Sequence, residues 1–206
     1  MDKNSFRWKM AVKQLKLLGI YDRTERIQGV RRDNWLLREG VWRQPNLDKD
    51  GKDITGCFLS HQLCIKKAKE EGAKNVFIFE DDFCMLSMDM KHLSDSLENL
   101  KKHDWDLFYL GGKVEEKLED IEKNLCSVKI WFTHAYAVNE GAFNKILAFK
   151  GDDSTFRGHS KGQIDVFYFL NDFKMYLINP MMTIQVQDDK TARPHWQMRS
   201  FMNKIL

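Results

Sequence analysis

Three consecutive carboxylates, Glu80, Asp81 and Asp82, directly follow an apolar run at 76–79. A continuous apolar run of this kind predicts a strand that is buried on both faces. In open α/β sheets, ligands bind outside the carboxyl ends of such strands. Adjacent carboxylates repel one another, and a hard divalent cation relieves that repulsion while it offsets charge on a diphosphate leaving group. A solvated loop that caps the following helix explains the same three residues equally well at this point.

Other catalytic signatures are absent from the sequence. It holds no GxGxxG, GxxxxGK[ST], HExxH or GxSxG pattern, so dinucleotide-binding, P-loop, zincin and α/β-hydrolase interpretations lack their defining loops. The cysteines Cys57, Cys64, Cys84 and Cys126 form no CxxC pair. We therefore expect reduced thiols, with neither a zinc framework nor a disulfide framework.

The composition is that of an ordinary globular protein. The 206 residues include 33 Lys and Arg against 30 Asp and Glu, and 43% of them are hydrophobic. This length predicts a single domain over residues 1–206, and the evenly mixed charge argues against a nucleic-acid partner. No stretch approaches the roughly 20 apolar residues that cross a bilayer. The first ten residues lack the apolar core of a secretory signal, so we expect a cytoplasmic protein.

Hydrophobic periodicity predicts the elements that position the acidic run. Gly19 and Gly72 are expected to end the first two helices in the left-handed conformation. Strand–helix alternation along the chain favours an α/β fold with a mostly parallel central sheet flanked by helices. We predict helices over 5–18, 57–71, 91–102, 141–149 and 164–171, and strands over 25–30, 76–79, 107–110, 128–132, 134–138, 175–179 and 182–187.

Two further segments have a different character. The polar stretch 31–55 reads as irregular, with a turn in its LDKDGKD run. The C-terminal segment, about 191–206, mixes apolar and basic residues as a tail or helix. We expect it to dock back on the domain, the alternative being a membrane surface or a partner protein.

The run GCFLSHQLCIKKAKEEGAKNVFIFEDDF, residues 56–83, resembles the signature of glycosyltransferase family 25. This family includes bacterial lipopolysaccharide glycosyltransferases and procollagen galactosyltransferases. Its pattern is a Gly-Cys/Ala-x-x-Ser-His helix, a loop with Gly, an apolar strand and then Glu-Asp-Asp. The similarity continues through DWDLFYLGG (104–112), THAYAVNEGAF (133–143), QID (163–165) and INP (178–180), and covers about residues 5–190.

The resemblance implies a metal-dependent glycosyltransferase with a GT-A, Rossmann-like fold. Its donor would be a nucleotide sugar, UDP-glucose or UDP-galactose by analogy, with Mn²⁺ or Mg²⁺ at the acidic motif. Family members are classed as inverting, so a base would deprotonate a hydroxyl of a glycan or glycoprotein acceptor. A carboxylate suits that role, and a bridging metal assists departure of a diphosphate.

The same resemblance assigns roles to individual residues. Asp82 and Asp81 are the expected metal ligands. Asp165 is the expected catalytic base, and Asp82 is expected to be catalytic as well through the metal. An aspartate in a first helical turn also complements the helix dipole without any catalysis. Donor binding is expected from six residues, each of which also has a structural explanation as a turn, a cap or a core contact: Gly56, Ser60, His61, Glu80, Asp81 and Gly111.

Several assignments stay open within the resemblance. Asp188, Asp189 and His195 are the unranked candidates for a third metal ligand. Gly112 stands beside Gly111 at a strand end, where either glycine permits close approach of a ligand or simply makes a turn. The strand that carries Thr133, His134 and Tyr136 borders the acceptor pocket in the family, with Tyr136 equally explained as a core residue.

The chain departs from the family pattern at its start. Family members open with a strand, whereas residues 1–4 lead directly into the predicted helix. A late start, a strand supplied by a homodimer partner, another chain or the tail, and loss of activity each explain this departure. The alternative function is therefore a catalytically degenerate binding or scaffold protein, and a third is a metal-dependent phosphate-transfer or hydrolase enzyme.

Overall fold

A six-stranded sheet forms the centre of the computed structural model, which describes residues 5–30, 55–150, 154–157 and 159–186. The strand order is β1-β6-β3-β9-β5-β4, so β1 is one edge of the sheet and the charged β4 is the other. The strands are β1 (Asn75–Phe79), β3 (Leu107–Tyr109), β4 (Lys113–Glu122), β5 (Leu125–Trp131), β6 (Ala135–Asn139) and β9 (Met175–Ile178).

Only one of the five strand pairs in this sheet is parallel. Strands β3 and β9 run in the same direction, whereas β1–β6, β3–β6, β5–β9 and β4–β5 are antiparallel. The expectation of a mostly parallel sheet is therefore wrong. Apolar runs report that a strand is covered on both faces, but they carry no information about its direction. Strand β6 follows β1 and β3 in sequence, yet it inserts between them in the opposite direction.

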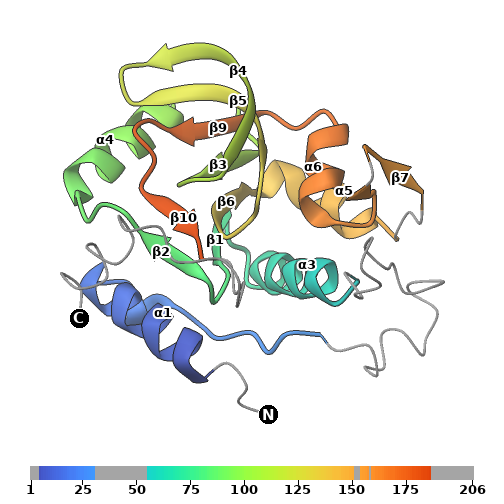
Figure 1. The fold of residues 1–206 in the computed structure, drawn as a ribbon, viewed down its shortest axis with the longest axis horizontal. Coiled ribbons are helices and arrows are strands. Elements are labelled where there is room, and N and C mark those ends of the chain that lie inside the picture. Colours follow the sequence, from blue (N-terminus) through green and yellow to red (C-terminus); the bar gives the residue numbers. More distant parts are fainter. Residues whose placement is uncertain (1–4, 31–54, 151–153, 158, 187–206) are drawn as a thin grey trace.

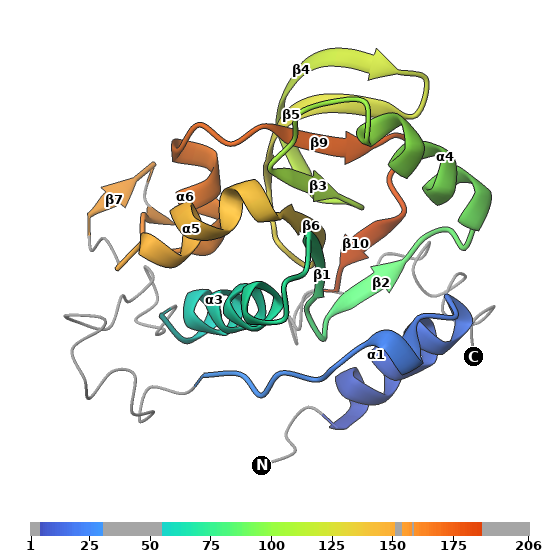
Figure 2. The ribbon, with the colours of Figure 1, turned by 180° about the vertical axis from the view of Figure 1, so that it is seen from behind.

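Helices and a small strand pair cover the two faces of the sheet (Figures 1 and 2). Helices α3 (Thr55–Glu70), α5 (Glu140–Ala148) and α6 (Ile164–Leu170) pack on one face. Helices α1 (Ser5–Leu17) and α4 (Met90–Leu100) pack on the other, with the antiparallel pair β2 (Phe83–Met85) and β10 (Thr183–Gln185). Successive strand residues point to opposite faces, so Ile78 joins the first core and Phe77 contacts the second. A separate two-stranded pair is formed by β7 (Thr155–Phe156) and β8 (His159–Ser160).

The five predicted helices are confirmed within a few residues at each end. Gly19 and Gly72 have φ angles of +68° and +72°, which is the left-handed conformation expected after a helix. The side chain of Asp89 caps α4 by accepting a hydrogen bond from the backbone N–H of His92. A short 3₁₀ turn, η1 (Tyr21–Arg23), follows α1.

The strand predictions fail where contacts with distant residues, rather than the local sequence pattern, decide whether a segment forms a strand. Residues 25–30 form no strand, and Val30 instead donates its N–H to the Ser60 hydroxyl of α3. The ten-residue β4 escaped prediction because nearly all of its side chains are exposed and most are charged. Charged side chains of this kind protect an edge strand against pairing with other chains. No strand precedes β1 among the described residues, so an added strand from elsewhere stays a prediction.

Helix α1 is fastened to β2 by one buried side chain. Gln14 donates from Nε2 to the carbonyl of Phe83 and accepts the N–H of Met85 at Oε1, at 3.1 and 2.7 Å. This amide satisfies two backbone groups on the side of β2 away from β10. The contact holds α1 beside the end of β1, where the acidic run lies.

Within the described part of the chain, no helix is long and apolar enough to span a membrane. All four cysteines are free, as the sequence predicts. The segments 31–54 and 187–206, with the predictions made for them, lie outside the described residues.

We predict that Gly111→Ala destabilises the protein by about 2–3 kcal/mol through overpacking. A Cβ at Gly111 would lie 1.9 Å from the backbone oxygen of Thr183, which joins β10 to the sheet. Gly141→Ala is the matched control, because a Cβ there meets no atom within 4 Å and the site is helical. That control should be neutral or stabilising by up to about 1 kcal/mol. Urea unfolding followed by circular dichroism measures both, and equal midpoints would contradict the packing argument.

Candidate active site

The acidic run forms a turn between the end of β1 and the start of β2. The N–H of Glu80 donates to the carbonyl of His134, and the N–H of Phe83 donates to the carbonyl of Glu80. Within this turn the three carboxylates have different partners. Glu80 interacts with α3 and the residues before β6, whereas Asp81 and Asp82 interact with α1.

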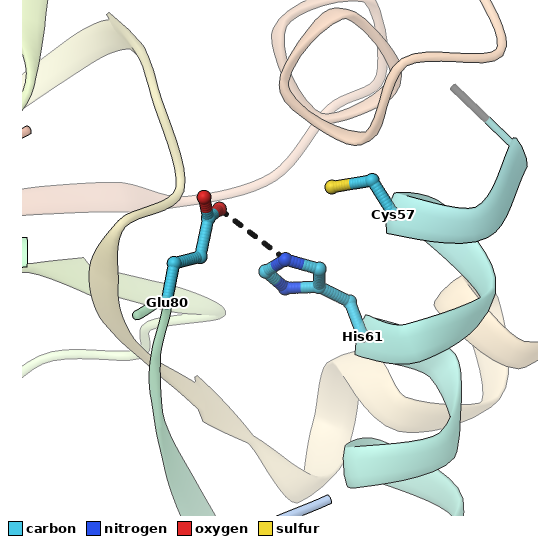
Figure 3. A group of neighbouring side chains, drawn as sticks. All are labelled: Cys57, His61 and Glu80. Atoms are coloured by element: carbon cyan, nitrogen blue, oxygen red, sulfur yellow. Dashed lines mark ion pairs between the residues drawn. The ribbon is translucent and has the colours of Figure 1, made fainter. Parts of the chain in front are cut away.

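Glu80 is the centre of a polar network, and Figure 3 shows its contact with His61. Its Oε1 lies 3.3 Å from Nε2 of His61 and accepts a hydrogen bond of 2.7 Å from the Thr133 hydroxyl. On the other side of the imidazole, Nδ1 lies 2.8 Å from the hydroxyl of Tyr136, which lies 3.1 Å from the hydroxyl of Tyr168. The network therefore joins β1, α3, β6 and α6.

The environment favours the charged forms of the pair at its centre. Burial by itself lowers the pKa of His61, but hydrogen bonds and charge from Cys57 and Glu80 raise it well above its ordinary value. Burial likewise acts to raise the pKa of Glu80, and contacts with His61 and Thr133 bring it below the usual carboxyl value. Glu80 and His61 thus form a buried ion pair.

Cys57 completes a group of three side chains at this place. Its Sγ, a ring nitrogen of His61 and a carboxylate oxygen of Glu80 all lie within 4.8 Å of one another. Cys57 and His61 are four residues apart on α3, so both project from the same face of the helix. Figure 3 shows the thiol pointing toward the other two side chains. Cys57 is exposed while His61 is buried, so the group opens toward solvent at the thiol.

Gly56 and Ser60 both act on the segment that precedes α3. A Cβ at Gly56 would lie 2.6 Å from the carbonyl oxygen of Val30, so glycine permits this close approach. The Ser60 hydroxyl accepts the N–H of Val30 at 2.8 Å and donates to the carbonyl of Gly56 at 2.6 Å. These contacts give both residues a structural role, and their predicted part in donor binding stays a prediction.

Asp81 and Asp82 share the guanidinium of Arg7. The Arg7 Nη1 lies 3.4 Å from Asp81 Oδ1 and 3.5 Å from Asp82 Oδ2. Asp82 Oδ2 also accepts a hydrogen bond of 3.2 Å from Gln185, while its Oδ1 is buried without a partner among the described residues. Burial and the charge of Glu80 raise the pKa of Asp82 to about 6, against the opposing effect of Arg7.

A pocket of about 390 Å³ lies against the carboxylates of Glu80 and Asp81. Part of its wall comes from Cys57, Ser60 and His61 on α3, and from Glu80 and Asp81 at the end of β1. The rest comes from α1, from residues 24–29, from Cys64 of α3 and from side chains of β1 and β2. Four of the residues predicted to bind a donor therefore line one pocket at the carboxyl end of an edge strand.

Asp165 lies in the first turn of α6, where its carboxylate accepts the N–H of Val166 at 2.9 Å. Burial raises the pKa of this carboxyl, while hydrogen bonds from the backbone of Val166 and Phe132 oppose the shift. The charge of Glu80 adds to the rise in the pKa of Asp165. A buried carboxyl with a raised pKa is a suitable proton acceptor.

The remaining predicted residues are packed into the protein or lie beyond its described part. Gly111 is buried against the backbone of Thr183, and a Cβ at Gly112 would overlap Ile130 and the Trp131 carbonyl. His134 is buried with its Nε2 3.1 Å from the Thr183 hydroxyl. Asp188, Asp189 and His195 lie outside the described residues.

Sequence analysis missed four participants, namely Arg7, Cys57 as part of the His61–Glu80 group, Tyr168 and Gln185. The spacing of four residues between Cys57 and His61 was the available signal, because it places both on one helix face. Arg7 and Gln185 gave no such signal, since they reach the acidic turn from distant parts of the chain.

The fold and the site define a mixed α/β protein with a polar pocket at the carboxyl end of an edge strand. The chain belongs to glycosyltransferase family 25, because residues 51–161 match the family model described as "Glycosyltransferase family 25 (LPS biosynthesis protein)". The matched residues contain α3, β1 and the acidic turn. The resemblance in the sequence is thereby confirmed.

Two curated relatives are similar in sequence to about half of this chain. One is the mouse "Inactive glycosyltransferase 25 family member 3", 30% identical over 104 residues that cover 47% of this chain and 18% of the relative. Another is the Xenopus laevis "Procollagen galactosyltransferase 1-A", 31% identical over 100 residues that cover 45% and 16%. The matched part thus spans less than a fifth of each relative. The solved structure of A197 from STIV superposes with a TM-score of 0.42 and 10% identity, covering 64% of this chain and 68% of that one.

Removing one partner of the buried ion pair should be costly, because the remaining charge stays buried. We expect Glu80→Gln and His61→Gln each to cost about 3 kcal/mol of unfolding free energy. The double variant should cost less than the sum of the two by about 1–3 kcal/mol. The control is the same cycle on the exposed pair Lys66–Glu70 of α3, which should show at most about 0.5 kcal/mol of coupling.

The pH at which the Glu80–His61 cycle should be measured follows from the pKa shifts of these two residues. The contribution of Glu80, whose pKa is lowered, is present above the ordinary carboxyl pKa of about 4.3. The contribution of His61, whose pKa is raised, is present below its ordinary value of about 6.5 and is lost as the pH rises through the raised value. Denaturant unfolding at about pH 5.5–6.5 therefore reports the full coupling, and additive costs in that range would contradict the ion pair.

Asp82→Asn should stabilise the metal-free protein at neutral pH. Since the folded state raises the pKa of Asp82 from 3.8 to about 6, its charged form is disfavoured and the protein loses stability as the pH rises between those values. At about 1.4 kcal/mol per pKa unit, the gain from Asn reaches at most about 3 kcal/mol at pH 7.5 and shrinks below pH 5. Thermal melts with chelator present measure it. The exposed Asp172→Asn is the control. An equal shift of the melting temperature of Asp82→Asn at about pH 7.5 and below about pH 5 would contradict the effect of burial on the Asp82 carboxyl.

Proposed function

We propose that this chain is a metal-dependent hexosyltransferase that transfers a sugar from a nucleotide donor, UDP-glucose or UDP-galactose by family analogy. The acceptor would be a hydroxyl group of a glycan or glycoprotein. The observation that carries the proposal is the pocket of about 390 Å³ bordered by Glu80 and Asp81, which lies at the family's acidic motif. Its volume lies in the range of small-molecule and cofactor sites.

Asp82 and Asp81 are the residues that would hold a divalent cation. The fit rests on Asp82 Oδ1, which is buried without a partner among the described residues, and on the raised pKa of this carboxyl. A buried oxygen in that condition is costly unless a donor or a cation satisfies it. Mn²⁺ or Mg²⁺ bound by such oxygens would supply Lewis-acid stabilisation of the charge on the diphosphate. Arg7 supplies positive charge to the same two carboxylates.

The other residues of the site would bind the donor and activate the acceptor. Ser60, His61 and Glu80 line the pocket, and their contacts hold the wall formed by α3 against the end of β1. Asp165 would take the proton from the acceptor hydroxyl as it attacks the anomeric carbon opposite the leaving diphosphate, which inverts the configuration. Its raised pKa suits that exchange of a proton.

A non-catalytic binding protein is the second candidate, for a specific reason. One of the two curated relatives is named an inactive member of the family, at an identity equal to that of the galactosyltransferase within one per cent. A chain of that kind would keep the fold and the pocket and would transfer no sugar.

Donor binding should be visible as thermal stabilisation. We expect one member of a panel of UDP- and GDP-sugars to raise the melting temperature in the presence of Mn²⁺, by a shift that corresponds to about 2.7 kcal/mol at one hundred times its dissociation constant. The shift should vanish in Asp82→Asn, measured against that variant's own ligand-free melt, and persist in Asp172→Asn. If folded protein shows no shift with any donor, the hexosyltransferase proposal is wrong.

Asp165→Asn should separate binding from catalysis. Loss of a general base typically lowers a rate by about 10²–10⁴-fold, and the donor-dependent thermal shift should remain. Slow Mn²⁺-dependent hydrolysis of the donor without acceptor supplies the assay, together with transfer to a glycan acceptor when one is found. Transfer that persists at the wild-type rate in this variant would exclude Asp165 as the base.

A further inference from the structure

We propose that Cys57, His61 and Glu80 form a binding site for a borderline-soft divalent cation of the Zn²⁺ type, distinct from the hard-cation ligands Asp81 and Asp82. This site lies in the wall of the same pocket. It does not depend on glycosyl transfer, since a chain without any transferase activity would present the same three ligands.

The ligand types are those that zinc prefers. A thiolate, an imidazole nitrogen and a carboxylate oxygen bind Zn²⁺ at about 2.0–2.3 Å, so neighbouring ligand atoms around one ion lie about 3–4 Å apart. The three atoms lie within 4.8 Å of one another here, and the His61–Glu80 distance of 3.3 Å already fits. Any remaining adjustment would fall on the exposed Cys57 side chain. Mg²⁺ and Mn²⁺ prefer sets made only of oxygen, as in Asp81 and Asp82.

The surroundings of the buried His61 and the half-buried Glu80 are a second, independent observation. Metal-binding histidines use their other ring nitrogen to donate to a hydrogen-bond acceptor, which fixes the ring. His61 has such a partner, because its Nδ1 lies 2.8 Å from the Tyr136 hydroxyl, which can accept a hydrogen bond, while Nε2 faces Glu80. Glu80 in turn is held by the Thr133 hydroxyl at 2.7 Å. Both ligands are therefore oriented before any ion arrives.

Without a cation, Nε2 of His61 faces the Glu80 carboxylate in the place that an ion would take. Binding would displace the proton from Nε2 and the proton of the Cys57 thiol, and Glu80 would exchange its contact with imidazolium for one with the ion. Three protein ligands leave a fourth tetrahedral position open toward the pocket, as in catalytic zinc sites. The position would be filled by water or by a polar group of a ligand in the pocket.

Cobalt spectroscopy tests the site directly. The full chain, freed of metal with chelator, is titrated with Co²⁺ and then with Zn²⁺. We expect a thiolate-to-cobalt charge-transfer band that saturates at one Co²⁺ per chain, and loss of that band on addition of an equivalent of Zn²⁺. Absence of the band in folded wild-type protein overturns the proposal.

Variants locate the ligands. Cys57→Ser should abolish the charge-transfer band without unfolding the protein, because Cys57 is exposed. Cys64→Ser, on the same helix but outside the group of three, should keep it. Loss of the band in Cys64→Ser with retention in Cys57→Ser would overturn the assignment. Asp82→Asn should also keep the band, which separates this result from the hard-cation site of the proposed transferase.

The role of Tyr136 as a positioning residue has its own readout. Tyr136→Phe should retain the charge-transfer band and weaken Zn²⁺ binding by about 10–100-fold, since only the orientation of His61 is lost. Competition with a chromophoric zinc chelator measures the affinity. An unchanged affinity would show that the ring is not oriented through Nδ1, and would remove that part of the argument.

Discussion

The half-buried carboxylate of Glu80 is the constraint to which the rest of the site is tied. A charged group removed from water must be paired and hydrogen-bonded, and Glu80 meets this need with His61 and Thr133. Those partners come from α3 and from the residues before β6, while Glu80 itself directly follows β1. One desolvated charge therefore fixes the position of a helix and two strands relative to one another.

Residues of the family motif hold neighbouring segments of the chain together. Gly56 admits the Val30 carbonyl, Ser60 binds the Val30 N–H, and His61 pairs with Glu80. The first two contacts hold residues 24–30 in place as a wall of the pocket, and the third closes the pocket at β1. The same residues thus create the space in which a ligand would bind, whichever of them touch it.

The turn at 80–82 separates two different sets of side chains. Glu80 joins a thiol and an imidazole, whereas Asp81 and Asp82 face a guanidinium and an amide. The first set suits a borderline-soft ion and the second a hard one. Consecutive residues reach opposite surroundings because the chain leaves β1 toward β2 at this point, with α3 on one side of the sheet and α1 on the other (Figure 1).

The sequence by itself determined the five helices, the buried core strands, the acidic strand end and the family. Helical periodicity, glycine stops and apolar runs are local, so they can be read without the fold. The tertiary structure alone decided what depends on distant partners. Strand direction followed from the insertion of β6 between β1 and β3, and the exposed β4 became a strand because β5 lies beside it. Arg7 and Gln185 reached Asp82 across 75 and 103 positions of sequence, where no local pattern could announce them.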